Sequence, residues 1–125
     1  MILNLTQHPA TSDQVAEGVV NLKGEEAEQA AYLLTFTTIP DQWDIIERAV
    51  NLAAIAKGAG AKEAMIGGAP YLMAPLEKAL LEVGITPLYA FSKRESAEKT
   101  LEDGSVIKTN KFVHLGFVAS AMEVE

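Results

Sequence analysis

The sequence contains no cysteine, and this absence excludes several kinds of chemistry. Disulfide bonds, thiolate metal sites and thiol nucleophiles all require cysteine sulfur. No metal-ligand spacing, nucleophile elbow or complete phosphate-binding loop is present either. We therefore predict no metal site and no cofactor, and the sequence leaves open whether the protein is an enzyme.

Long apolar runs are also missing, and positive charge is scarce. No apolar run approaches the roughly 20 residues that a membrane-spanning helix needs, and the first residues, Met1 to Thr6, carry no basic leader. The formal net charge of −7 opposes binding to the phosphate backbone of a duplex. We expect a cytoplasmic protein that binds neither membranes nor duplex DNA.

The amino-acid composition is that of an ordinary globular protein. The 125 residues are 49% hydrophobic and 22% charged, close to the usual proportions of folded domains and far from those of disordered chains. A chain of this length has room for one hydrophobic core. We predict a single α/β domain at residues 1–118 and a loose C-terminal tail at residues 119–125.

Short apolar runs that predict strands alternate with helix-prone segments. The runs occupy residues 2–5, 19–22, 62–66 and 88–91. The strongest helix signal covers residues 41–57, where apolar residues recur at spacings of three and four. A later helix is expected to begin near Pro75, because proline disturbs a helix interior. This alternation predicts a Rossmann-like three-layer sandwich with a mostly parallel sheet.

The last third of the chain predicts an antiparallel β-ribbon added to that sheet. Two β-prone stretches flank Asp103-Gly104, a dipeptide that favours a two-residue type I′ hairpin. Strand alternation is expected to put Val113, Leu115 and Phe117 on one side of the last strand and Phe112, His114 and Val118 on the other. Within this strand we interpret His114 as a packed structural residue.

Three polar clusters directly follow predicted strands, and they point to a ligand site. The clusters are Thr6-Gln7-His8, Gly67-Gly68 and Ser92-Lys93-Arg94-Glu95-Ser96. The carboxyl ends of parallel strands meet at one rim of an open α/β sheet, where ligands bind. We therefore expect these clusters to converge on a single crevice.

The first two clusters each have a binding interpretation and a simpler structural one. Gly67-Gly68 can aim backbone N–H groups at an anion, or it supplies only the positive φ of a tight turn. His8 can donate to a phosphate or act as a general base, or it is a surface histidine before a proline. A functional role is favoured for His8 over His114, because His8 directly follows a predicted strand whereas His114 lies inside one.

The third cluster combines hydroxyls, cations and a carboxylate. Arg94 is suited to clamp a phosphate, and Ser92 lies on the same face of the predicted strand. The alternative is a solvated strand edge whose charges resist aggregation. The candidate catalytic residues are His8 and Arg94, and the candidate ligand-binding residues are Thr6, Gln7, Gly67, Gly68 and Ser92.

Several of these segments carry a resemblance to known proteins. The chain resembles a group of small bacterial α/β proteins of uncharacterised function through Asn4-Leu5-Thr6-Gln7-His8-Pro9-Ala10, Gly67-Gly68-Ala69-Pro70 and the ribbon from Phe91-Ser92 to Gly116-Phe117-Val118. The His8-Pro9 turn is also similar to that of CRISPR-associated Rossmann-like (CARF-like) ring nucleases. That second resemblance implies a homodimer whose rim binds a cyclic RNA ligand without a metal.

Two functional hypotheses follow. In the first, the rim binds a phosphate-bearing ligand, a nucleotide or a short or cyclic oligonucleotide, with metal-independent phosphodiester cleavage as an extension. In the second, the protein is a non-catalytic module that binds a metabolite or assembles with other chains through its C-terminal ribbon, because exposed β edges recruit partners. In both, we expect a homo-oligomer.

Overall fold

Five strands form one mixed sheet in the computed structural model, which describes residues 1–120; of the predicted tail at 119–125, residues 121–125 lie outside the described residues. The strand order is β2-β1-β3-β4-β5. The first four strands are parallel, and β4 pairs with β5 in antiparallel register. The strands are β1 (Ile2–Leu5), β2 (Val19–Asn21), β3 (Glu63–Ile66), β4 (Thr86–Thr100) and β5 (Val106–Ala119).

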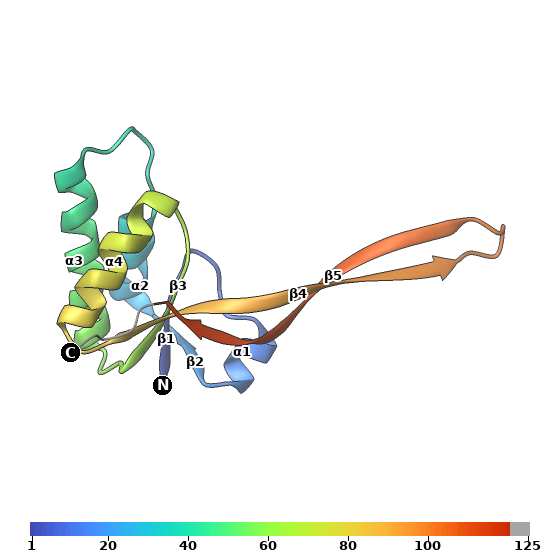
Figure 1. Cartoon of the computed structure of the whole chain (residues 1–125), viewed down its shortest axis with the longest axis horizontal. Coiled ribbons are helices and arrows are strands. Elements are labelled where there is room, and N and C mark those ends of the chain that lie inside the picture. The colour runs from blue at the N-terminus through green and yellow to red at the C-terminus, as the bar shows by residue number, and fades with distance from the viewer. Residues whose placement is uncertain (121–125) are drawn as a thin grey trace.

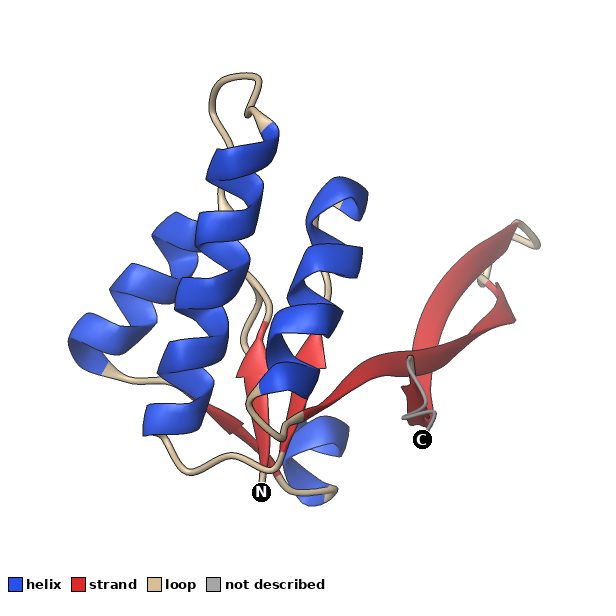
Figure 2. Ribbon diagram, turned by 60° about the vertical axis from the view of Figure 1, so that its left-hand side comes forward, coloured by secondary structure: helices blue, strands red, loops and turns tan. Residues whose placement is uncertain are grey.

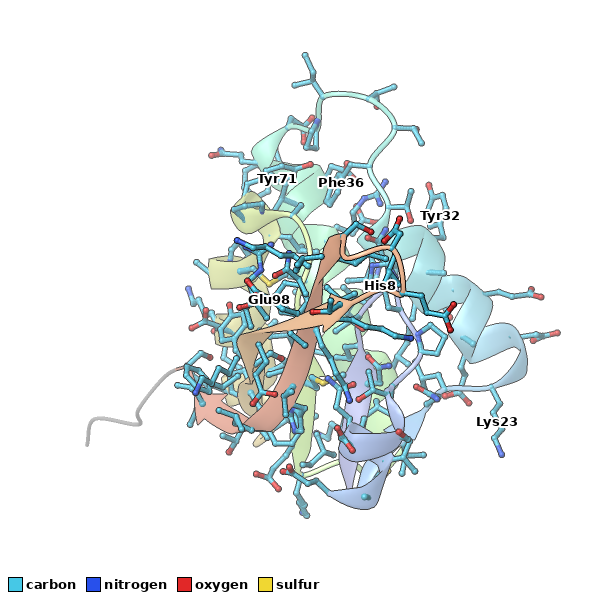
Figure 3. All side chains as sticks on the ribbon, turned by 90° about the vertical axis from the view of Figure 1, so that its right-hand side faces the viewer. His8, Lys23, Tyr32, Phe36, Tyr71 and Glu98 are labelled. Carbon is cyan, nitrogen blue, oxygen red and sulfur yellow. The ribbon has the colours of Figure 1, made fainter. Side chains whose placement is uncertain are left out.

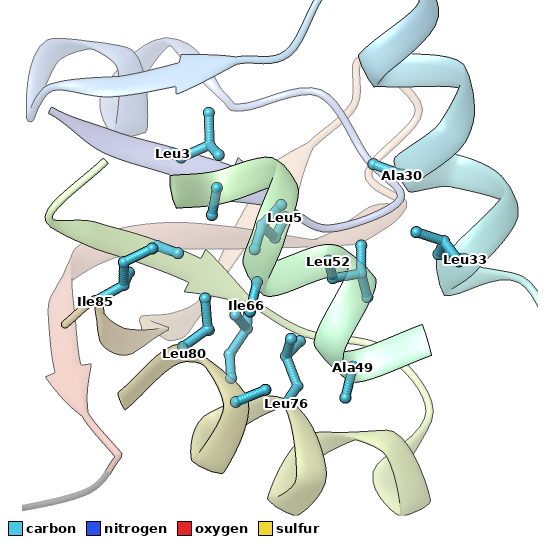
Figure 4. Packing of buried hydrophobic residues seen from close by; sticks show 14 of the residues in the cluster. Leu3, Leu5, Ala30, Leu33, Ala49, Leu52, Ile66, Leu76, Leu80 and Ile85 are labelled. Atoms are coloured by element: carbon cyan, nitrogen blue, oxygen red, sulfur yellow. The ribbon is translucent and has the colours of Figure 1, made fainter. Parts of the chain in front are cut away.

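Three helices cover one face of this sheet: α2 (Gly24–Leu34), α3 (Gln42–Gly58) and α4 (Pro70–Glu82). Figure 1 shows them together on one side. Leu5 and Ile66 are register partners on adjacent strands and point toward these helices, where Leu52, Leu76 and Leu80 complete a buried cluster (Figure 4). Three of the buried residues of α3 are alanines, and these small side chains let the helix lie close to the sheet.

Among residues 1–120, the opposite face carries the short helix α1 (Ser12–Ala16) and the curled end of the ribbon. His114 of β5 reaches α1's end, where its Nε2 lies 3.1 Å from Oε1 of Glu17. This contact joins the curled end of the sheet, which forms a half-barrel, to the α1 side. The mixed α/β fold, the mostly parallel sheet and the antiparallel ribbon are confirmed; the finer three-layer sandwich is not.

A bulge in β5 changes the predicted alternation of its side chains. Phe91 pairs with Gly116 but Ser92 pairs with His114, so Leu115 is an extra residue on β5. The rings of His114 and Phe117 therefore contact each other, with centroids 4.9 Å apart. The prediction that these two residues lie on opposite sides is wrong, because an inserted residue reverses the alternation beyond it.

The ribbon turn is longer than the predicted two-residue hairpin. Residues 101–105 separate the two strands, and the N–H of Leu101 donates to the carbonyl oxygen of Ser105 at 2.8 Å. A type I′ turn needs positive φ at both central residues. In this turn Gly104 has φ +85° and Asp103 does not adopt a positive φ, so the type I′ prediction is wrong.

Helix α4 also begins earlier than predicted. It runs without interruption from Pro70 to Glu82 and contains Pro75. Pro75 lacks the N–H that would reach back one turn, but it lies close enough to the helix start for the remaining bonds to persist. Leu72 and Leu76 are both fully buried, and their packing holds the first turns in place.

Candidate functional site

A cleft of about 440 Å³ opens at the carboxyl ends of β1 and β3. The chain runs from β1 to β2 on one side and returns to β3 on the other, so the strand order reverses at this point. Open α/β sheets bind ligands at such switch points. The cleft is lined by Thr6, Gln7, His8, Pro9, Thr11, Gln14, Met65, Ile66, Gly67, Gly68, Tyr89 and Ala90.

The loop after β1 is organised by Asn4, a polar side chain buried in the middle of that strand. Its Nδ2 donates to the carbonyl oxygen of His8 and to Oδ1 of Asn21, each at 2.8 Å. Its Oδ1 accepts from the backbone N–H of Thr6 at 2.9 Å and from the Thr6 hydroxyl at 2.7 Å. A buried amide with all these partners fixes the path of the loop that presents His8.

The side chains of this loop point in different directions. Gln7 donates from Nε2 to the Thr35 hydroxyl at 2.9 Å, which ties the loop to the end of α2. Figure 3 views the molecule from the side of the ribbon and shows His8 on that side. The His8 side chain is exposed and therefore accessible to a ligand in the cleft.

One wall of the cleft is the start of α1. Thr11 caps this helix by accepting from the N–H of Gln14 at 3.2 Å, and the Gln14 side chain accepts from the N–H of Thr11 at 3.0 Å. This reciprocal pair of hydrogen bonds is a capping box. The box holds two cleft-lining residues in a defined position.

The opposite wall is the glycine turn between β3 and α4. Gly68 has φ +140°, a conformation that L side chains rarely adopt. At Gly67, an added Cβ would lie 3.6 Å from Cγ2 of Thr6, which shows how closely the two loops approach. No side chain caps α4, so the backbone N–H groups at its start are not occupied by a capping side chain.

Tyr89 joins the cleft to α4. Its hydroxyl donates to Oε2 of Glu77 at 2.9 Å. Burial of the phenol, followed by this hydrogen bond to a carboxylate, raises the pKa of Tyr89 to about 12. The hydroxyl therefore stays protonated at neutral pH, and its hydrogen bond to Glu77 holds Tyr89 in place as a wall of the cleft.

Two of the predicted site residues lie elsewhere. Ser92 and Arg94 are exposed on the ribbon and are not among the residues that line the cleft. The guanidinium of Arg94 lies 5.7 Å from the ring centroid of Phe112, its cross-strand partner. The structure thus brings Thr6, Gln7, His8, Gly67 and Gly68 together at one cleft and leaves Ser92 and Arg94 outside it.

Sequence reasoning missed the residues that support the cleft. Asn4 and Asn21 are register partners on β1 and β2, and Asn21 Oδ1 also accepts from the N–H of Ala10 at 3.0 Å. The available signal was Asn4 itself, a polar residue inside an apolar run that predicts a buried strand. A buried amide requires partners, and the nearby loop supplies them.

The described residues offer no ready metal site. Within residues 1–120, no group of three or more His, Asp or Glu side chains is placed to hold a metal ion. In the same part of the chain, no helix is long and apolar enough to cross a membrane.

Comparison with known proteins gives one match. The model of a family described as the uncharacterized protein MJ1673 family matches residues 1–118. This range contains all the cleft residues and ends one residue before the end of β5. No curated protein and no solved structure matches the chain.

Proposed function

The chain belongs to the uncharacterized protein MJ1673 family, and from that premise we propose that its cleft binds a phosphate-bearing ligand, a nucleotide or a short or cyclic oligonucleotide. The observation that carries the proposal is the convergence of the His8 loop and the Gly67-Gly68 turn on one cleft at the β1/β3 switch point. This is the rim at which Rossmann-like proteins bind nucleotides.

The chemistry of the cleft lining suits an anion with little charge. Although the chain carries a net charge of −7, none of the residues that line the cleft is Asp or Glu. A phosphate there avoids direct repulsion, and it meets hydroxyl, amide, imidazole and backbone N–H donors. Because Lys and Arg are also absent from this lining, a singly charged phosphodiester fits better than a triphosphate.

The glycine turn is the proposed anion contact. Backbone N–H groups between a strand and a helix start can bind phosphate oxygens, assisted by the positive end of the helix dipole. Gly68 adopts a backbone conformation open mainly to glycine, so the turn is a fixed geometry. His8, across the cleft, supplies a further donor.

We extend the proposal to cleavage of a short or cyclic RNA. The 2′-hydroxyl of a ribose attacks the adjacent phosphorus, His8 accepts the hydroxyl proton, and the 5′-oxygen leaves and takes a proton from water. The products are a 2′,3′-cyclic phosphate and a 5′-hydroxyl. Orientation and charge stabilisation provide much of the rate in such a reaction, and no metal is required. A homo-oligomer and a CARF-like relationship are parts of this same proposal.

Binding is tested by NMR titration with inorganic phosphate, a mononucleotide, and linear and cyclic oligoadenylates. We expect amide shifts at Gly67, Gly68 and His8 for the oligonucleotides. Gly68→Ala is expected to weaken binding about tenfold or more. An L residue is strained at φ +140°, so the turn shifts, and losing one charge-assisted hydrogen bond to the phosphate lowers affinity by about this factor. Gly104→Ala is the matched control, since Gly104 also has a positive φ but lies at the ribbon tip. Equal binding by both variants would contradict the site.

Cleavage is tested separately by chromatography of the products. His8→Ala is expected to retain binding and lose turnover, and a ligand with 2′-deoxyribose is expected to bind without being cut. Arg94→Ala reports on the other candidate catalytic residue, which lies on the ribbon. Binding without any turnover in the wild type favours the alternative function, a non-catalytic binding module.

A further inference from the structure

In the part of the chain that the structure describes, the outer part of the β4–β5 ribbon packs against no other element. Figures 1 and 2 show it projecting from the sheet, away from α3 and α4. Every residue from 91 to 112 is exposed. A two-stranded ribbon alone is marginally stable in water, so this segment gains stability when another surface covers it.

The tip of the ribbon carries three exposed apolar side chains next to a preformed turn. Leu101, Val106 and Ile107 are 36%, 55% and 44% exposed. The turn between them is closed by the 2.8 Å bond from the N–H of Leu101 to the carbonyl oxygen of Ser105. Asp103 accepts from both the N–H and the hydroxyl of Ser105, at 2.9 and 2.6 Å. The tip is thus a shaped element whose apolar side chains face solvent.

A complementary surface lies at the other end of the molecule. A groove of about 420 Å³ separates α3 from α4. Its walls are mostly small or apolar, and Ile46 and Val50 are 44% and 52% exposed there. Lys78 and Glu82 line the same groove. Exposed apolar surface that is gathered in a groove marks an interaction site more often than scattered apolar residues do.

The distribution of charge favours a second copy of this chain as the occupant. Residues 86–119 carry five Lys and Arg against four Asp and Glu, whereas residues 1–85 carry five against eleven. The ribbon is therefore the one large part of the chain that the acidic body does not repel. Next to the apolar tip lie Lys99 and the ion pair of Lys108 with Glu98, and the turn carries Glu102 and Asp103. The tip therefore offers charges of both signs to Lys78 and Glu82 at the groove.

We propose that the ribbon tip of each copy, Leu101, Val106 and Ile107, docks in the α3–α4 groove of a second copy. The tip and the groove lie at opposite ends of the long axis of the molecule (Figure 1). A two-fold axis perpendicular to that long axis brings both tips to both grooves at once. The contacts then close as a dimer, with the two chains antiparallel and side by side, instead of extending into a fibre.

The oligomeric state tests this proposal by sedimentation across a dilution series. We expect a dimer for the wild type and at least about tenfold weaker association for Ile107→Asp and for Val50→Asp, because each buries a charge in the apolar contact. The matched controls are Ser96→Asp on the middle of the ribbon and Asn51→Asp on α3, which add the same charge at exposed positions outside the contact. A monomeric wild type, or a groove variant that dimerises normally, would overturn the proposal.

Mixing the two variants distinguishes this arrangement from ribbon-to-ribbon pairing. Ile107→Asp keeps its groove and Val50→Asp keeps its tip, so a mixture can form one intact contact per pair. We expect the mixture to associate more strongly than either variant alone. No gain on mixing would contradict a tip-in-groove contact.

Cross-linking gives a direct second measurement, because the wild-type chain has no cysteine. A mixture of Ile107→Cys and Val50→Cys chains is expected to form a disulfide-linked dimer on mild oxidation, and either variant alone is expected to remain mostly uncoupled. Efficient coupling of Ile107→Cys with itself would show that tips meet tips and would overturn the proposal.

Discussion

The side-chain amide of Asn4 donates to the backbone carbonyl oxygen of His8 at 2.8 Å, so a residue buried inside β1 sets the position of the candidate histidine four residues later. The same side chain accepts from the N–H and the hydroxyl of Thr6. The loop is therefore held by the strand it leaves. The geometry of the cleft depends on a residue that does not need to touch the ligand's phosphate.

Asn4→Ala is expected to lower the free energy of unfolding by about 2–3 kcal/mol, because the variant loses several hydrogen bonds and leaves buried groups without partners. Urea unfolding measures this loss. Hydrogen exchange of residues 6–10 should quicken more than exchange in α3. Asn110→Ala is the control, since Asn110 is an exposed ribbon residue and its change is expected to stay within about 0.5 kcal/mol.

The two adjacent glycines of the turn are expected to respond differently to the same substitution. Gly68→Ala forces an L residue to φ +140° and is expected to cost about 1–3 kcal/mol. Gly67→Ala places a methyl group 3.6 Å from Cγ2 of Thr6, an ordinary contact, and is expected to cost less than about 1 kcal/mol. Thermal unfolding of both variants checks this order. Equal losses would show that crowding, not the backbone angle, constrains the turn.

The sequence predicts the parallel core of the fold because local and long-range signals agree there. The apolar runs of β1 and β3 pair in register, and their alternate residues enter the core as strand geometry requires. The two rim clusters at His8 and Gly67 converge for the same reason. Parallel strands of one sheet bring their carboxyl ends together whatever the distance along the chain.

The features that the sequence did not predict are a bulge, the curl of the sheet and the length of β4. None of them is marked by a local sequence pattern. Leu115 is an apolar residue in an apolar strand, and nothing in its type marks it as the extra residue of a bulge. The curl that brings His114 to Glu17 follows from that bulge and from the twist of a long ribbon. Arg94 was grouped with the rim because β4 was expected to end sooner; β4 instead continues to Thr100 and carries Arg94 away from the cleft.

Arg48 is expected to be a strong determinant of stability at the end of α2. Its Nη1 donates to the carbonyl oxygens of Tyr32, Leu33 and Thr35 at 2.9, 3.2 and 2.8 Å. Its Nε donates to Asp44 at 3.0 Å, and the guanidinium carbon lies 4.5 Å from the ring centroid of Phe36. A cation there also compensates the negative end of the helix dipole.

Arg48→Lys should therefore cost about 1–3 kcal/mol, because an ammonium group cannot reproduce the planar, multiple-donor geometry of guanidinium. Chemical denaturation checks the value. Lys57→Arg, an exchange of the same two residue types at an exposed site on α3, serves as the control and is expected to be neutral. A neutral Arg48→Lys variant would show that the charge alone is sufficient.

The raised pKa of Tyr89 leads us to expect a specific loss of stability at high pH. The pKa of Tyr89 rises from 10.0 to about 12, first through burial and then through its bond to Glu77. Since the folded protein holds this proton more tightly than the unfolded chain, the contribution is complete below pH 10 and is lost as the pH rises from about 10 to 12. We expect this contribution to the free energy of unfolding to amount to about 1 kcal/mol, because partial exposure and solvent screening reduce the value implied by the shift.

Lysines also titrate in this range, so the quantity to measure is the difference in the free energy of unfolding between the wild type and Tyr89→Phe, from urea unfolding. That difference should shrink between pH 9.5 and 11.5 by about the stated amount. Tyr71→Phe, which removes a tyrosine hydroxyl but keeps the ring that contacts Phe36, is the matched control variant. If the wild type and Tyr89→Phe instead lose stability in parallel, the folded protein does not hold the Tyr89 proton more tightly than the unfolded chain does.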